Sequence, residues 1–148
     1  MKSISLVIAL YNQLEFTRQC LASIKAHTPP PFELILIDNG SVDGTAEYLR
    51  GVDATVISNA QNLGCAKAWN QGIRASRGDV IGILNNDLLM TAGWSEALLA
   101  FMEQGGHGIV CPSAREGQLD YDLAAYAREF TKACAGAVRR DLYAPCML

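Results

Sequence analysis

The sequence predicts an α/β fold, in which a mainly parallel β-sheet is flanked by helices. Short apolar runs without charge alternate along the chain with segments of helical periodicity, the pattern of proteins built from βαβ units. Polar turn residues follow the apolar runs and mark where strands end. Of the 148 residues, 50% are hydrophobic and 18% are charged, which excludes a disordered chain and suits one domain with a real core.

The first half of the chain is expected to supply three strands and two helices. The uncharged run 3–10, rich in Ile, Leu and Val, predicts a strand buried on both faces. Between residues 14 and 28 apolar side chains recur on one helical stripe, until three successive prolines prevent the helix from continuing. The apolar run 32–37 predicts the second strand. Residues 45–50 then predict a short helix, and 54–58 the third strand.

The second half begins with a helix and a further buried strand. Helix 65–76 carries small and apolar residues on one side, and strand 80–84 follows it. The apolar positions of 95–102 predict a helix that two glycines terminate. Three weaker patterns complete the chain: a short strand at 108–111, a helix at 120–134 and an edge strand at 138–143.

The net charge, the hydropathy and the cysteines limit the classes of protein to which this chain can belong. Lys and Arg total 12 and Asp and Glu total 15, giving a net charge of −3. This balance argues against nucleic acid as a partner. No apolar run approaches the length of a transmembrane helix, and the first one has no cleavage signal. The cysteines number five, without a C-x-x-C pair, which predicts reduced core residues in a cytoplasmic protein.

Small and polar side chains lie at or directly after the ends of four of the expected strands. They are Ala9, Tyr11 and Asn12, then Asp38 and Asn39, then Asn59 and Asn62, and finally Asn85, Asn86 and Asp87. In an open parallel sheet, ligands bind in the crevice beyond the carboxyl ends of the strands. A rim of amides and carboxylates offers donors and acceptors for the base and ribose of a nucleotide. The sequence therefore predicts a nucleotide site at this edge.

Asp87 is the candidate metal ligand. A carboxylate that follows a buried strand loses hydration unless it finds a partner. Mg²⁺ takes only one or two protein carboxylates and leaves its other positions to phosphate oxygens and water. An equally good interpretation is that Asp87 or Asn86 caps the next helix or forms a local turn.

Two further candidates lie in and after the loop that precedes helix 65–76. The backbone amides around Gly64 could face an anion, although a tight turn explains this glycine more simply. Asn70 either reaches the crevice or is exposed. The chain has neither the P-loop nor the dinucleotide-binding glycine pattern.

Four segments, taken together and in this order, resemble the N-terminal half of family 2 glycosyltransferases with the GT-A fold. They are Leu6–Asn12, Glu33–Thr45, Asn62–Asn70 and Gly82–Asp87. The resemblance covers residues 3–111 and implies a Rossmann-like GT-A fold truncated in its acceptor half. Residues 1–111 would form the nucleotide-diphospho-sugar-binding core, and 112–148 would begin the acceptor-side region of the same domain.

The resemblance also implies roles for the candidate residues. Asn85-Asn86-Asp87 stands where the family has its D-x-D motif, and Asp87 would bind Mg²⁺ or Mn²⁺ between the two phosphates of the donor. Asp38 would accept a hydrogen bond from a pyrimidine ring N–H, which favours a UDP or dTDP sugar. The other residues implied to contact the nucleotide sugar are Ala9, Tyr11, Asn12, Asn39, Asn62, Gly64, Asn70, Asn85 and Asn86.

The expected function is metal-dependent, inverting transfer of a hexosyl or deoxyhexosyl group to an acceptor hydroxyl in polysaccharide biosynthesis. The acceptor could be a glycan, a lipid-linked sugar or a protein, and no residue fits the general base of the family. The chain is expected to be a truncated form in the cytoplasm or at the inner membrane face. One alternative is a non-catalytic GT-A-like module for nucleotide binding or assembly. A nucleotidyltransferase is disfavoured because Ala9–Gln13 is neither glycine-rich nor basic.

Overall fold

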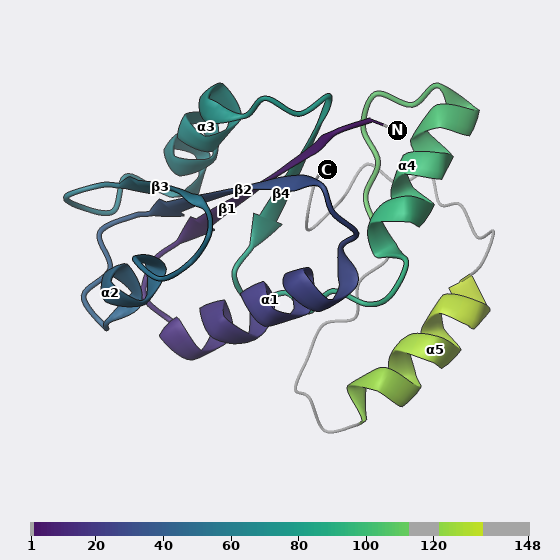
Figure 1. Cartoon of the computed structure of the whole chain (residues 1–148), viewed down its shortest axis with the longest axis horizontal. Helices are drawn as coiled ribbons and strands as arrows, with labels where there is room; N and C mark the ends of the chain where they lie inside the picture. Colours follow the sequence, from purple (N-terminus) through teal and green to yellow (C-terminus); the bar gives the residue numbers. More distant parts are fainter. Residues whose placement is uncertain (1, 113–121, 135–148) are drawn as a thin grey trace.

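In the computed structural model, which describes residues 2–112 and 122–134, four strands alternate with helices (Figure 1). The elements in chain order are β1 (Ile4–Leu10), α1 (Leu14–His27), β2 (Phe32–Asp38), α2 (Thr45–Leu49), β3 (Thr55–Ser58), α3 (Cys65–Ala75), β4 (Val80–Asn85), α4 (Trp94–Gly105) and α5 (Leu123–Cys134). The sheet has the order β3-β2-β1-β4, and each neighbouring pair is parallel. The predicted α/β class and parallel sheet are therefore confirmed.

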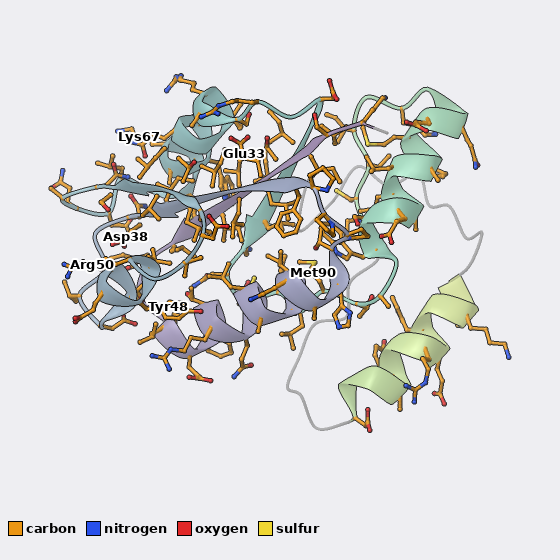
Figure 2. All side chains as sticks on the ribbon, viewed as in Figure 1. Glu33, Asp38, Tyr48, Arg50, Lys67 and Met90 are labelled. Carbon is orange, nitrogen blue, oxygen red and sulfur yellow. The ribbon has the colours of Figure 1, made fainter. Side chains whose placement is uncertain are left out.

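Helices cover both faces of the sheet. Figure 1 shows α1 and α2 on one side and α3 on the other. Leu6, Ile8 and Leu36 point toward α1 and α2, and Tyr48 and Met90 extend this side of the core (Figure 2). The alternate residues of the strands form a second, smaller core beneath α3. This alternation follows from the period of two in a β-strand, and it explains why the strands carry apolar residues on both faces.

Helix α3 approaches the sheet closely at Gly72. A Cβ atom at this position would lie 2.3 Å from Cγ1 of Val7 and 2.8 Å from Cδ1 of Ile37. Because only glycine leaves room for this approach, Gly72 sets the distance between α3 and the sheet. This distance also places the loop that enters α3.

A hydrogen-bonded cluster joins the elements at the opposite, amino-terminal edge of the sheet. The Glu33 carboxylate accepts a hydrogen bond from the Ser5 hydroxyl at 2.6 Å and another from the backbone N–H of Arg77 at 2.9 Å. These bonds, that of Ser5 first, lower the pKa of Glu33, because they stabilise its ionised form. The cluster ties β1, β2 and the turn before β4 together.

Two of the weaker sequence predictions have different outcomes. The strand predicted at 108–111 was wrong, because this stretch is irregular. Only Val110 is buried, whereas Ile109 is 68% exposed, so the segment packs through one side chain instead of forming a ladder. The helix predicted at 120–134 is described from Leu123 onward, and 138–143 lies outside the described residues.

In the described part of the chain, no helix has the length and apolarity needed to span a bilayer.

Candidate functional site

An open hollow of about 260 Å³ lies beyond the carboxyl ends of β1, β2 and β4. Its wall consists of Ala9, Leu10, Tyr11, Asn39, Asn62, Cys65, Asn85, Asn86 and Asp87. The chain runs from β1 to β2 and β3 in one direction, whereas β4 lies on the other side of β1. The connections diverge at this switch point and leave a crevice, which is where ligands bind in open α/β sheets. Most of the site residues predicted from the sequence meet here.

Asp38 does not line the hollow, although it lies at the same edge. Its side chain is only 3% exposed, and Oδ1 accepts the backbone N–H of Ser41 at 3.0 Å. This bond closes the turn after β2, and the next residue, Asn39, then reaches the wall. Asp38 therefore shapes the turn that presents Asn39.

Asn12 also shapes the rim from outside the wall. Asn12 and Gln13 have φ angles of 56° and 63°, a left-handed conformation that asparagine tolerates better than most residues. The N–H of Asn12 donates to the Ser41 hydroxyl oxygen at 2.8 Å, and its Oδ1 accepts the N–H of Val42 at 2.9 Å. These contacts lock the β1–α1 turn onto the β2–α2 turn and hold Tyr11 above the hollow.

The loop before α3 forms one wall. The Asn39 side chain donates from Nδ2 to Oδ1 of Asn62 at 2.8 Å, and its own Oδ1 accepts the N–H of Leu63 at 3.0 Å. Gly64 donates its N–H to Oδ1 of Asn62 at 2.9 Å, so it supports the wall without lining it. Asn70 is exposed on α3 and is not part of the wall either.

Asp87 stands on the opposite side of the hollow. It is exposed, and within 2–112 and 122–134 its carboxylate has no hydrogen bond or ion pair. Asn86 donates from Nδ2 to the Thr17 hydroxyl oxygen at 3.0 Å, which fixes its carboxamide. Helix α4 has Gly93 at its N-cap and no side-chain capping bond, so among the described contacts neither Asn86 nor Asp87 caps that helix.

The oxygen atoms of this wall suit a hard divalent cation whose remaining positions are filled by oxygen atoms of a bound ligand. The Asp87 carboxylate, which has no partner among the described residues, lies beside the amides of Asn85 and Asn86 and matches the oxygen preference of Mg²⁺ and Mn²⁺. Within the described residues, no group of three or more His, Cys, Asp or Glu side chains could hold a metal ion. A cation here would therefore depend on oxygen atoms supplied by the ligand.

The two cysteines nearest the site differ in their surroundings. Cys20 is buried as predicted, its Sγ lies 3.6 Å from the carbonyl oxygen of Asn85, and burial raises its pKa to about 12. Cys65 was expected in the core, but it is exposed and lines the hollow. It is the first residue of α3 after the loop turn, so its place after the Asn62–Gly64 motif was the signal for a wall position.

Comparison with known protein families identifies the family of this chain. The family model described as glycosyl transferase family 2 matches residues 5–143. The chain belongs to glycosyl transferase family 2. Among the similar proteins, the putative glycosyltransferase EpsH of Bacillus subtilis is 27% identical over 131 residues, covering 82% of this chain and 38% of EpsH. The glycosyltransferase AglE of Haloferax volcanii is 30% identical over 100 residues, covering 63% of this chain and 33% of AglE.

Solved structures of glycosyltransferases share the fold. The mannosyltransferase PcManGT from Pyrobaculum calidifontis, solved with GDP-Man and Mn²⁺, superposes with a TM-score of 0.68 at 22% identity, covering 77% of this chain and 36% of that one. S. aureus TarS in complex with UDP-GlcNAc gives 0.65 at 18% identity, with 81% and 38% coverage. The predicted GT-A fold is confirmed. The family 2 chain spans less than two-fifths of the length of each of these relatives and structures.

Proposed function

We propose that this family 2 chain forms the nucleotide-sugar-binding part of an inverting, metal-dependent glycosyltransferase. The donor would be a UDP or dTDP hexose or deoxyhexose, and the acceptor a hydroxyl group in polysaccharide biosynthesis, in the cytoplasm or at the inner membrane face. The observation that carries the proposal is the exposed Asp87 carboxylate, which faces an amide-lined hollow at the switch point of the sheet. The nucleotide sugars in the two neighbouring structures support it.

The two sides of the hollow suit the two halves of such a donor. On the β4 side, Asp87 would hold Mg²⁺ or Mn²⁺ against the diphosphate, with Asn85 and Asn86 beside it. When bound, the cation would stabilise the charge that develops on the departing nucleoside diphosphate. On the β2 side, Asn39 and Asn62 would bind oxygen atoms of the nucleoside.

Residues of the central strand and of the β2 turn would complete the nucleoside pocket. The Tyr11 side chain, 48% exposed, offers a ring face to a base, and the small Ala9 leaves space beside it. The contact expected between Asp38 and a pyrimidine N–H stays a prediction. Oδ1 of Asp38 already accepts the Ser41 N–H, so Oδ2 is the less occupied oxygen for such a contact.

The general base of the transfer is assigned to residues outside this hollow. Among the described residues of the wall, Asp87 is the only carboxylate, and the proposal places it on the metal. We therefore expect the 148-residue chain to bind a donor but to transfer sugar poorly. The alternative, a non-catalytic GT-A-like module for nucleotide binding or assembly, predicts no sugar transfer by this chain and, for an assembly module, no binding of any nucleotide.

Calorimetry with UDP, dTDP and GDP, each with and without Mn²⁺, tests the proposal. We expect Mn²⁺ to strengthen the binding of at least one nucleotide, and Asp87→Asn to remove most of that gain, because it takes away the carboxylate that would hold the cation. Asp53→Asn is the matched control, because Asp53 is exposed, does not line the hollow and loses the same charge. Absence of binding by every nucleotide would contradict the donor site. Binding that ignores both Mn²⁺ and Asp87→Asn would contradict the metal role.

A further inference from the structure

Two polar side chains behind the wall of the hollow bind each other. Asn59 donates from Nδ2 to Oε1 of Gln71 at 2.8 Å, and Gln71 donates from Nε2 to Oδ1 of Asn59 at 2.9 Å. Both residues are partly buried, and neither lines the hollow. The pair closes a ring of two hydrogen bonds, so each carboxamide fixes the orientation of the other.

Rigid elements hold both members of this pair. The backbone N–H of Asn59 donates to the carbonyl oxygen of Asp38 at 2.8 Å, which ties Asn59 to the end of the β2–β3 ladder. Gln71 lies on α3 directly before Gly72, where the helix is packed against the sheet. The Asn59–Gln71 pair therefore joins the sheet to α3 at a fixed distance.

The pair acts on the wall through Asn39. Besides its bond to Gln71, Nδ2 of Asn59 donates to Oδ1 of Asn39 at 3.1 Å. Asn39 donates in turn to Asn62. A continuous chain of amide hydrogen bonds thus runs from α3 to the hollow.

The backbone sets the donor-to-acceptor direction along this series of hydrogen bonds. A backbone N–H can only donate, so the N–H groups of Leu63 and Gly64 require Oδ1 of Asn39 and Oδ1 of Asn62 to face them. A carboxamide oxygen has two lone pairs, and both oxygens use both of theirs. Oδ1 of Asn39 accepts from Asn59 and Leu63, and Oδ1 of Asn62 accepts from Asn39 and Gly64. The two side chains have only N–H donors left for the hollow.

We infer that Asn59 and Gln71 are positioning residues that hold Asn39 and Asn62 with their N–H groups toward the ligand. This inference rests on the proposed function and makes it more specific. The wall on the β2 side recognises acceptor oxygens of the nucleoside, which are base carbonyl or ribose oxygens. Asp87 lies across the hollow on the β4 side and would bind the diphosphate by means of the cation. Loss of the pair should therefore weaken binding of the nucleoside and leave binding of the diphosphate intact.

The isosteric change Gln71→Glu tests this division. It replaces the Nε2 donor by an oxygen that faces Oδ1 of Asn59, and a rotated Asn59 would turn its own oxygen toward Oδ1 of Asn39. The control Gln61→Glu adds the same charge at an exposed position in the loop before α3, outside the network. Gln71→Met removes the pair without adding charge and serves as the second variant if Gln71→Glu does not fold.

Calorimetry with two probes separates the outcomes. The first probe is whichever of UDP, dTDP and GDP the unmodified chain binds most tightly with Mn²⁺, and the second is inorganic pyrophosphate with Mn²⁺. We expect Gln71→Glu to weaken the nucleotide about tenfold, Gln71→Met about threefold, and Gln61→Glu not at all, in line with the loss of one or two hydrogen bonds. The affinity for pyrophosphate should stay the same in all three variants.

Other results overturn the inference in distinguishable ways. If the nucleotide binds the unmodified chain and both Gln71 variants equally, the positioning role is refuted while the donor site stands. If nucleotide and pyrophosphate weaken together, the pair has a general structural role only. If the unmodified chain binds no nucleotide, the proposed function fails and the inference fails with it.

Discussion

Gly72→Ala tests how closely α3 must approach the sheet to form the hollow. The added methyl group would lie 2.3 Å from Cγ1 of Val7 and 2.8 Å from Cδ1 of Ile37, whereas carbon atoms in contact prefer about 3.5–4.0 Å. Both neighbours are fully buried, and a β-branched side chain on a strand has little rotational freedom. The helix must therefore move outward by about 1 Å or more.

The cost of this movement follows from two opposing effects. Overpacking a core costs about 1–3 kcal/mol, and the rigid neighbours place Gly72→Ala near the upper end. Replacing glycine by alanine inside a helix returns about 1 kcal/mol. The net loss in the free energy of unfolding is then about 2 kcal/mol, which corresponds to a fall in Tm of about 4–8 °C for a chain of this size.

Thermal unfolding followed by circular dichroism measures the effect, and nucleotide calorimetry measures its consequence for the site. Because α3 carries Cys65 and Gln71, its displacement should also weaken nucleotide binding. The control is Gly51→Ala, whose Cβ would lie 3.8 Å from its nearest neighbour, the carbonyl oxygen of Tyr48. That variant should be unchanged or slightly more stable. A Tm for Gly72→Ala equal to that of Gly51→Ala would refute the close-packing argument.

Three further outcomes concern cysteine reactivity and pH. In the native chain, iodoacetamide at pH 8 should alkylate Cys65 rapidly, and a bound nucleotide with Mn²⁺ should protect it. Peptide mass spectrometry reads this out, and unprotected alkylation would contradict its place on the wall. Cys20, buried and with a pKa of about 12, should react only after unfolding, so labelling at the native rate of Cys65 would contradict its burial. Because the folded-state pKa of Glu33 is lowered, its stabilising effect is present above its unfolded pKa of about 4.3 and is lost as pH falls through the folded value. The Tm of the unmodified chain should therefore drop more steeply below pH 4.3 than that of Glu33→Gln, and parallel curves would refute this role.

The sequence by itself determined the elements of the sheet and the edge that carries the site. The apolar runs around Leu6, Leu36 and Leu84 are local patterns. Such uninterrupted apolar runs are typical of strands that are buried on both faces in a parallel sheet. Each of the four strands that the structure describes lies within one residue of its predicted bounds, whereas the strand predicted at 108–111 does not form. Because the carboxyl ends of parallel strands meet at one edge, the placement of Asn39 and Asp87 around a common crevice could also be expected from the sequence.

The tertiary structure alone decided which polar residues line the hollow and which support them. Asp38 and Asn39 are neighbours in sequence and both are buried, yet Asp38 closes a turn whereas Asn39 lines the hollow. Asn59 and Gln71 carried no recognisable pattern for pairing, because their contact depends on how closely Gly72 lets α3 approach the sheet. Local patterns encode strands and turns, whereas the direction of a hydrogen bond between two elements is set only when packing fixes the distance between them.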